Sequence, residues 1–227
     1  MMNPVLKRTI TGLAVGMVVL FAILFAPLEV FPAVLEVLAL LAYAEYALLL
    51  RKKVQLLSLT GGVFLVVGLI AILGGLGSLA AVAFKGGTPM RGNLMLLYVV
   101  MIVKFSDVGG FAFGVSSAKL MKGGNHKMCP SISPGKSWEG MAGSIFASCL
   151  VSLCWMPWGT GYSLAKTLAL GVVAAVVGTL GDLVESKFKR WIGVKDSTAL
   201  KFTNGMGGLL DMFDSLIFAP AVLYPFL

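Results

Sequence analysis

Apolar residues in this chain form long, nearly uninterrupted runs, and polar or glycine-rich segments separate one run from the next. A helix needs about 20 mostly apolar residues to cross the hydrocarbon core of a membrane. The pattern therefore predicts an all-α fold, a polytopic helical membrane protein of about seven transmembrane helices. The expected spans are Ile10–Pro27, Phe31–Leu50, Leu56–Gly75, Leu94–Gly114, Gly140–Trp158, Leu164–Leu183 and Gly208–Phe226.

Two of these runs have more than one interpretation. Leu56–Phe84 is too long for one straight span and is interrupted by Gly74–Gly77, so we expect a span followed by either an interfacial or a re-entrant piece. Met1–Ala26 has the basic start and apolar run of a signal peptide. No clear small-residue cleavage site follows it and more spans come after it, which favours a first transmembrane helix.

Composition strengthens the membrane interpretation, and charge placement orients the chain. Hydrophobic residues make up 58% and charged residues 12%, against about 25% charged in a typical soluble domain. Basic residues gather at Lys7–Arg8, at Arg51–Lys53, and in the segments 115–138 and 186–205. The positive-inside rule puts all four on the cytoplasmic side if the N-terminus is cytoplasmic. The net charge of +8 then reflects topology and anionic lipids, so we expect no nucleic-acid partner.

The last quarter of the chain, Gly181–Ser215, concentrates charge in an otherwise apolar protein. It holds five of the ten acidic residues of the chain. An apolar membrane protein gains little structurally from such a cluster, so the cluster calls for a chemical explanation. Its carboxylates are Asp182, Glu185, Asp196, Asp211 and Asp214, and its bases are Lys187, Lys189, Arg190, Lys195 and Lys201.

The spacing within this cluster places chemistry on two helices. Asp182, Glu185, Ser186 and Lys189 follow the helical period and share one face, and Asp211 and Asp214 have the same relation at the start of the last span. Paired carboxylates suit a hard cation, and nearby bases suit phosphates. A solvated charge run at the membrane surface would explain the bases. It does not explain two carboxylates inside an apolar segment.

A second group of polar residues lies in and after the span 94–114. Lys104 and Asp107 are three residues apart and can pair on one helix face. A lone charge near mid-membrane costs about 2.5–3.5 kcal/mol, so such residues face a protein interior or a polar cavity. Both a structural ion pair and a place at the edge of a functional site remain open for Asp107.

The segment Ser133–Gly140 contains a Gly-Lys-Ser sequence that is not a Walker A loop. Pro130 stands where that motif needs its first glycine, and no strand is expected before it. What remains is a turn that offers hydroxyls, backbone amides and Lys136 ahead of a helix N-terminus. The single histidine, His126, is expected to be a loop residue near the membrane surface. Cys129, Cys149 and Cys154 lack metal-ligand spacing and are expected to be free.

These residues resemble the phosphatidate cytidylyltransferase (CDP-diacylglycerol synthase) family. Asp107-Val108-Gly109 and the segment 133–140 are similar to the first cytoplasmic region of the family. Its C-terminal pattern runs Ser-x-x-Lys-Arg, Lys-Asp, His-Gly-Gly and Asp-Arg-x-Asp, and here the histidine is replaced by Met206 and the arginine by Met212. The matching positions are Ser186, Lys189-Arg190, Lys195-Asp196, Gly207-Gly208, Asp211 and Asp214.

The resemblance implies transfer of CMP from CTP to phosphatidate, with CDP-diacylglycerol and pyrophosphate as products. It implies Mg²⁺, with a second cation as an option, and membrane lipids as surroundings. We expect an integral protein of the bacterial inner (cytoplasmic) membrane, with a homodimer as one option. Two regions follow: 1–93 with N-terminal transmembrane helices, and 94–227, the catalytic transmembrane region, with cytoplasmic loops 115–138 and 186–205.

The expected roles divide the site residues into three sets. Asp182, Asp211, Asp214 and Lys189 are the expected catalytic residues. Substrate contacts are expected from Ser133, Lys136, Ser186, Arg190, Lys195 and Asp107. The expected metal ligands are Asp182, Asp211 and Asp214, joined by Glu185 and Asp196.

Two other functions would use similar residues. A CTP-dependent lipid kinase, similar to polyprenol or phytol kinases, would transfer the γ-phosphate and release CDP. A cation-coupled transporter would place its charges near mid-membrane and show repeat symmetry. Most charges here lie toward the expected cytoplasmic edge, and no repeat is visible. The transporter is therefore the weaker alternative.

Overall fold

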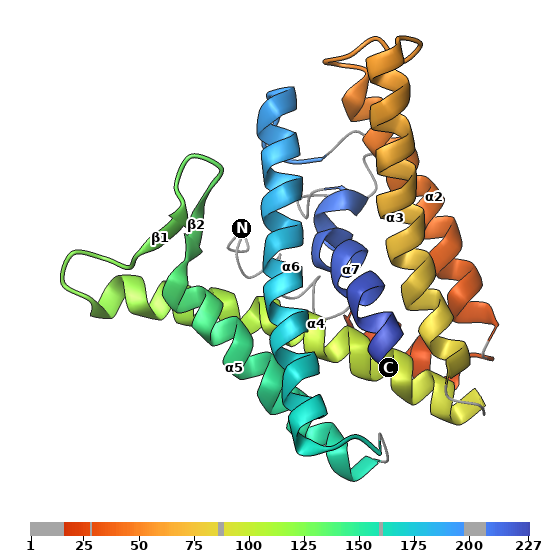
Figure 1. The fold of residues 1–227 in the computed structure, drawn as a ribbon, viewed down its shortest axis with the longest axis vertical. Coiled ribbons are helices and arrows are strands. Elements are labelled where there is room, and N and C mark those ends of the chain that lie inside the picture. The colour runs from red at the N-terminus through yellow and green to blue at the C-terminus, as the bar shows by residue number, and fades with distance from the viewer. Residues whose placement is uncertain (1–15, 28, 86–88, 159–160, 198–207) are drawn as a thin grey trace, which may run out of the picture.

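The computed structural model describes residues 16–27, 29–85, 89–158, 161–197 and 208–227. Helices dominate these residues, and one small antiparallel hairpin interrupts them (Figure 1). In chain order the elements are a helix Gly16–Phe25, α2 (Val30–Leu50), α3 (Leu59–Lys85), α4 (Pro89–Leu120), β1 (Lys127–Cys129), β2 (Ser133–Ser137), α5 (Trp138–Trp155), the 3-10 turn η1 (Met156–Trp158), α6 (Leu164–Ile192), α7 (Leu209–Leu223) and the 3-10 turn η2 (Tyr224–Phe226).

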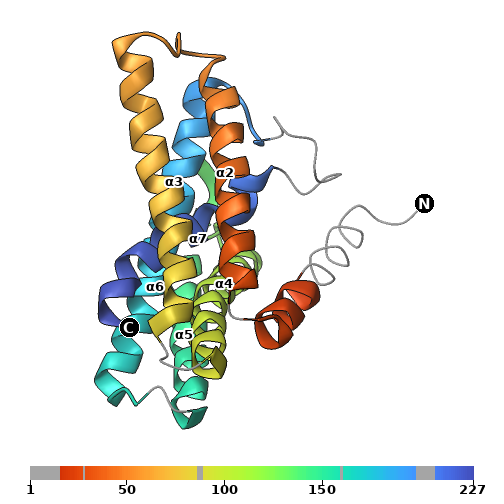
Figure 2. The ribbon, with the colours of Figure 1, turned by 90° about the vertical axis from the view of Figure 1, so that its right-hand side faces the viewer.

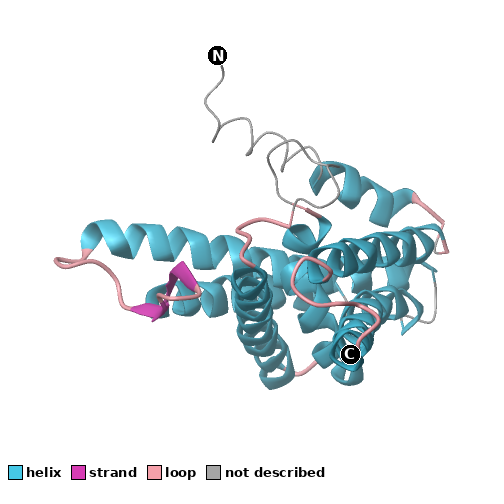
Figure 3. Ribbon diagram, turned by 90° about the horizontal axis from the view of Figure 1, so that it is seen from above, coloured by secondary structure: helices cyan, strands magenta, loops and turns pink. Residues whose placement is uncertain are grey.

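The helices pack as two groups joined by α4. Helices α2 and α3 form an antiparallel pair, and α7 packs between α3 and α6 (Figures 1 and 2). Helix α4 runs across the direction of α2, α3 and α6, and α5 packs along α4 and against α6. Seen from above, the hairpin lies beside α4 near the end of this helix that is distant from α2 and α3 (Figure 3). This arrangement places β2 against α4, α5 and α6.

Helical membrane architecture is confirmed. Five helices in the described ranges are long and apolar enough to cross a membrane: α2, α3, α4 from Arg91, α6, and α7 with η2. Helix Gly16–Phe25 is apolar but shorter in its described part, and α5 does not belong to the five. Many large apolar side chains are exposed on the helices, such as Val66, Ile70 and Phe146. In a membrane protein these side chains face lipid.

Helix α3 corrects one expectation. The segment Gly74–Gly77 does not interrupt the helix, which continues through it to Lys85. A Cβ at Gly75 would lie 1.9 Å from the carbonyl oxygen of Ile217 in α7, whereas a Cβ at Gly74 would meet nothing within 4 Å. Glycine at 75 therefore lets two backbones approach closely, as small residues do between membrane helices. The glycines mark a packing contact and not a break.

Helices α4 and α6 extend further than hydropathy indicates. Helix α4 continues to Leu120, within the expected loop 115–138, and α6 continues to Ile192, within the expected loop 186–205. Helix α6 ends at Gly193, whose φ of 89° is a left-handed conformation that glycine adopts readily. Hydropathy detects the apolar part of a helix, and these two helices continue as polar helices past it. The division at residue 93 stays a prediction.

The hairpin replaces most of the remaining loop. Strand β1 pairs with β2, with Lys127 opposite Ser137 and Cys129 opposite Ser133. Ser137 then begins α5, because its Oγ accepts the Gly140 N–H at 3.1 Å. The strand that carries Lys136 thus leads directly into a capped helix, which fixes where the lysine points.

Candidate active site

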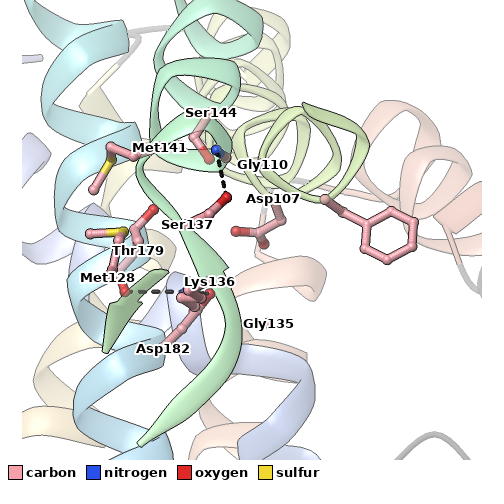
Figure 4. A pocket seen from close by; sticks show the side chains of 12 residues that line it. Asp107, Gly110, Met128, Gly135, Lys136, Ser137, Met141, Ser144, Thr179 and Asp182 are labelled. Carbon is pink, nitrogen blue, oxygen red and sulfur yellow. Dashed lines mark hydrogen bonds and ion pairs between the residues drawn. The ribbon is translucent and has the colours of Figure 1, made fainter. Parts of the chain in front are cut away.

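A half-open pocket of about 240 Å³ lies where β2, α4, α5 and α6 meet. Gly135 and the side chain of Lys136 enter it from β2, and Asp107 enters it from α4 (Figure 4). Gly110 and Gly140, which also line the pocket, allow α4 and α5 to approach each other closely. Its polar lining consists of Asp107, Lys136, Ser137, Ser144, Thr179 and Asp182.

Lys136 and Asp182 form the central ion pair of this pocket. Lys136 Nζ lies 2.6 Å from Asp182 Oδ2 and also donates to the carbonyl oxygen of Thr179 at 3.2 Å. Both side chains are largely shielded, with 22% and 18% of their surface exposed. The second oxygen of the carboxylate, Asp182 Oδ1, is buried and has no hydrogen-bond partner among the described residues. A buried carboxylate oxygen of this kind favours a further positive ligand.

Lys189 joins α6 to α7. Its Nζ lies 3.1 Å from Glu185 Oε2 on its own helix and contacts Asp211 Oδ1 on α7. Glu185 Oε1 is buried without a hydrogen-bond partner in the described ranges. Glu185 and Lys189 are buried and Asp182 is partly buried, while Lys187 and Arg190 on the same helix are exposed. The predicted face of α6 is therefore the face that turns inward.

Asp211 organises the entry to α7. Its Oδ2 accepts the N–H of Gly208 at 3.0 Å and the N–H of Ser197 at 2.9 Å. In return, Ser197 Oγ accepts the N–H of Asp211 at 3.3 Å. A carboxylate at a helix N-terminus satisfies N–H groups that have no partner within the helix and lies favourably in the helix dipole. Asp211 thus connects the start of α7 to α6 through Lys189, and to the chain before α7 through Ser197 and Gly208.

Lys104 connects α4 to α7. Its Nζ lies 3.4 Å from Asp107 Oδ2 and donates to Ser215 Oγ at 3.0 Å and to the Met212 carbonyl at 3.2 Å. Ser215 Oγ in turn donates to Asp107 Oδ2 at 2.9 Å. The predicted Lys104–Asp107 pair is confirmed, and it belongs to a network that also holds the first turns of α7.

Carboxylates from three helices meet at this place. Asp107 of α4, Asp182 of α6 and Asp214 of α7 lie close enough to interact electrostatically, and Glu185 interacts with Asp214 in the same way. Within the described ranges, no group of three or more His, Cys, Asp or Glu side chains is arranged to hold a metal ion. Lysines occupy the positions that face the carboxylates instead. The unpartnered oxygens of Asp182 and Glu185 nonetheless suit a hard cation, which binds to oxygen ligands.

The remaining expected residues lie around this centre. Ser186 is half-buried on α6, and Ser133 is half-buried at the start of β2. Arg190 is exposed and donates to the Val194 carbonyl at 3.3 Å. Lys195 and Asp196 are exposed in the chain after α6. Met206, which stands for the family histidine, lies outside the described residues.

Three partners of the site were not foreseen from the sequence. Glu45 of α2 is fully buried and accepts the Leu210 N–H at 3.0 Å. Ser197 and Ser215 are also fully buried and hold Asp211 and Asp107, respectively. A glutamate in the middle of an apolar run is a signal that could have identified Glu45. The serines carry no such signal, because serine is common both in membrane helices and in the segments that connect them.

His126 braces the hairpin and lies outside the pocket. Its Nδ1 lies 2.6 Å from Glu139 Oε1, and its backbone N–H donates to the same carboxylate. This hydrogen bond from the His126 side chain lowers the pKa of Glu139 to about 2. Glu139 therefore stays ionised at neutral pH and ties the start of α5 to the chain before β1. The expectation of a loop residue is consistent with this place.

Comparisons with known proteins place these residues in a family. A family model described as the cytidylyltransferase family matches residues 55–227. A protein of Staphylococcus aureus (strain COL) named phosphatidate cytidylyltransferase is 41% identical over 138 residues, which is 60% of this chain and 50% of that protein. Proteins of the same name are 39% identical in Staphylococcus saprophyticus and 40% identical in Staphylococcus epidermidis, each over 137 residues with the same shares covered. The chain spans about half the length of the curated relatives it matches.

Proposed function

The chain belongs to the cytidylyltransferase family, and we propose that it transfers CMP from CTP to phosphatidate, which yields CDP-diacylglycerol and pyrophosphate. One observation carries the proposal: the matched range 55–227 contains every side chain of the pocket and of its ion pairs. The named relatives support the choice of phosphatidate as the acceptor.

The reaction needs charge neutralisation more than it needs a base. The phosphate of phosphatidate is a phosphomonoester with a second pKa near 6, so it is largely dianionic at pH 7. One of its oxygens would form a bond to the α-phosphorus of CTP, and the bond from that phosphorus to the oxygen bridging to the β-phosphorus would break. The electron pair leaves with pyrophosphate. The absence of the family histidine at Met206 removes no group that this step requires.

Lysines that now face carboxylates are the residues proposed to contact phosphates. Lys136 is held in the pocket by Asp182, and Lys189 is held between α6 and α7 by Asp211. Both lysines would exchange these partners for phosphate oxygens. Ser133 would line the nucleotide side with Lys136. Ser186, Arg190 and Lys195 would contact phosphates nearer the membrane surface. In this proposal the lysines would supply positive charge where two anionic substrates approach each other, and such charge lowers the barrier to phosphoryl transfer.

The carboxylates are proposed to hold Mg²⁺, with a second cation as an option. Asp182, Asp211 and Asp214 would be the main ligands, with Glu185 and Asp196 as further candidates. The unpartnered oxygens of Asp182 and Glu185 support this assignment. When bound, the cation would neutralise phosphate charge and hold the reacting groups in line. Asp107 faces the same carboxylates from α4 and would help to position them.

The location of the site fits a lipid acceptor. Asp182, Glu185 and Lys189 lie on α6, which is long enough to span a membrane, toward the end where this helix becomes polar. An acceptor with two acyl chains would keep them in the bilayer and present its phosphate at this level. We propose the bacterial inner (cytoplasmic) membrane as the location and its cytoplasmic face as the side of reaction. A homodimer remains a prediction on which this mechanism does not depend.

The test is an assay of the purified protein in mixed micelles with labelled CTP, phosphatidate and Mg²⁺. We expect a CDP-lipid and pyrophosphate in equal amounts, and loss of both when the divalent cation is chelated. Asp182→Asn should lower kcat at least about 100-fold, because it removes a charge that acts on the reacting phosphates. Glu36→Gln is the matched control, since Glu36 is exposed on α2 far along the chain from the site.

Two results would contradict the proposal. Release of CDP together with a newly phosphorylated lipid would identify a kinase-type reaction. If Asp182→Asn forms CDP-lipid as fast as the wild type, the activity is present but this pocket is not where the reaction takes place.

A further inference from the structure

Glu45 is an acidic residue within the apolar helix α2, and none of its surface is exposed. A charged side chain at such a depth is costly unless polar groups surround it. Helix α2 has no role in the pocket, and Glu45 precedes residue 55, where the family match begins. The match therefore assigns no role to this carboxylate.

The carboxylate reaches the N-terminus of α7. The Leu210 N–H donates to Glu45 Oε2 at 3.0 Å, across 165 positions of the chain. The first N–H groups of a helix have no partner within the helix, and this end carries a partial positive charge. Glu45 thus does for α7 what a capping side chain ordinarily does from the adjacent residue.

Gly208 shows how close this approach is. A Cβ at this position would lie 2.1 Å from Glu45 Oε1 and 1.7 Å from the Ser197 carbonyl oxygen. Its φ of −91° is accessible to any residue. Glycine is therefore needed here for space, and the space is filled by the carboxylate from α2 and by the backbone that follows α6.

Two carboxylates share the N–H groups at the start of α7. Asp211 Oδ2 accepts the Gly208 N–H, while Glu45 accepts the Leu210 N–H. Because Glu45 satisfies Leu210, the Asp211 carboxylate remains available to Ser197 and Lys189. Asp214 lies one turn further along the same helix, so the direction of the first turn also determines where its carboxylate lies.

We propose that Glu45 is a positioning residue that anchors the N-terminus of α7 and so holds Asp211 and Asp214 opposite the inward face of α6. Within the described ranges, Glu45 is not part of the pocket lining, and the ion pairs of Lys136 and Lys189 are made with other carboxylates. Its consequence for catalysis rests on the proposed function, whereas the anchoring itself does not. Loss of the anchor would let the Asp211 carboxylate turn toward the freed N–H groups and would weaken the proposed cation site.

Amide hydrogen exchange of the full-length protein in detergent tests the anchoring. In Glu45→Ala we expect the amides of residues 208–214 to exchange about fivefold faster than in the wild type, the size of a lost capping interaction. Glu45→Gln should fall between the two, because its amide oxygen can still accept the Leu210 N–H without the charge. Glu36→Gln, on the same helix but exposed, should match the wild type.

The dependence of CDP-lipid formation on Mg²⁺ tests the consequence. The half-saturating Mg²⁺ concentration of Glu45→Ala should rise about fivefold, while the KM for CTP should change less than about twofold. A purely structural role would lower the melting temperature without changing the ratio of the half-saturating Mg²⁺ concentration to the KM for CTP. If Glu45→Ala does not fold, Glu45→Gln and Glu45→Asp carry the same comparison.

The outcomes separate the two proposals. Unchanged exchange at 208–214, or equal increases in the Mg²⁺ requirement and the KM for CTP, would overturn the positioning role. If the wild type makes no CDP-lipid, the proposed function fails, and exchange alone then decides the anchoring. Faster exchange confined to α7 supports it, and equal rates overturn it.

Discussion

Lysine–carboxylate pairs hold the candidate site together at the scale of single residues. Lys136 pairs with Asp182, and Lys189 pairs with Glu185 and Asp211. In each pair the lysine is more shielded than an ordinary surface lysine, so removing one partner leaves a charge in a poorly hydrated place. Under the proposed function these pairs would be a resting arrangement, because a phosphate and a cation arriving together would offer both groups new partners of opposite charge.

Lys136→Met should impair nucleotide use without unfolding the protein. The change removes the positive group that faces Asp182 and the Thr179 carbonyl, so we expect the KM for CTP to rise about tenfold or more. Steady-state kinetics of CDP-lipid formation measure this. Lys127→Met is the matched control, because Lys127 is exposed on the paired strand. Equal effects of the two variants would show that the loss of any positive charge from the hairpin raises the KM for CTP, and that the contacts of Lys136 are not the cause.

Lys104→Met should lower stability through α7. It leaves Asp107, Ser215 and the Met212 carbonyl without their shared donor. About a third of each charged side chain is exposed, so we expect a loss of about 1–2 kcal/mol rather than the full cost of a buried charge. Thermal unfolding in detergent measures it, with Lys119→Met on the exposed face of α4 as control. Adding Asp107→Asn should recover part of the loss, and no recovery would argue against charge pairing as the cause.

Close helix contacts at glycine are the main feature at the scale of elements. Helix α3 approaches α7 at Gly75, and α4 approaches α5 at Gly109 and Gly143, where an added Cβ would lie within 3 Å of neighbouring atoms. Lipid gives apolar helices little reason to prefer each other, so close backbone packing contributes much of their association. These contacts set the angles at which α4, α6 and α7 bring their polar residues together.

Gly75→Ala and Gly74→Ala should have opposite effects. In Gly75→Ala the ideal position of the added methyl group lies 1.9 Å from the Ile217 carbonyl oxygen. We expect this overlap to lower the free energy of unfolding by about 1–3 kcal/mol. The second meets nothing within 4 Å and should be neutral or stabilise the helix by up to about 1 kcal/mol. Thermal unfolding of the two variants compares them directly. Similar losses in both would show that helix α3 needs flexibility here, as a break would.

Element boundaries show where sequence reasoning was insufficient. The hairpin 127–137 contains proline, glycine and serine in place of an alternating apolar pattern, so the residues alone predict a turn. Its strands are held by the contact of Lys136 with Asp182 of α6 and by the brace between His126 and Glu139, which are tertiary contacts. Strand formation in this segment depends on neighbours that a local pattern does not contain.

At the scale of the whole molecule, the described chain alternates between two ends. The turn between α2 and α3 and the end of α6 lie at the upper end in Figure 1, and the start of α6 and the end of α7 lie at the lower end. The upper end carries Arg51–Lys53, Lys189 and Arg190. Basic residues on one side are what the positive-inside rule requires of the cytoplasmic face. The orientation itself stays a prediction.

Cysteine labelling tests the orientation. In a protein whose three cysteines are changed to serine, Lys127→Cys should react with a membrane-impermeant maleimide only in inside-out vesicles, because the hairpin is expected in the cytoplasm. Ala165→Cys, exposed at the start of α6, should react only in right-side-out vesicles. Reversal of both patterns would invert the topology. Labelling of both from one side would contradict the expected crossing of the membrane between the hairpin and the start of α6.

The sequence by itself determined the helical membrane class, the inward face of α6, the pairing of Lys104 with Asp107 and the family. These features depend on hydropathy over one span, on the period of one helix or on residues close in the chain, and all three are encoded locally. Only the tertiary structure decided that α3 continues through Gly74–Gly77, that Lys136 faces Asp182, and that Glu45 anchors α7. The last two join segments far apart in the chain, and the continuity of α3 depends on its packing against α7. Such contacts exist only after the helices have packed at particular angles, and no local pattern of residues specifies those angles.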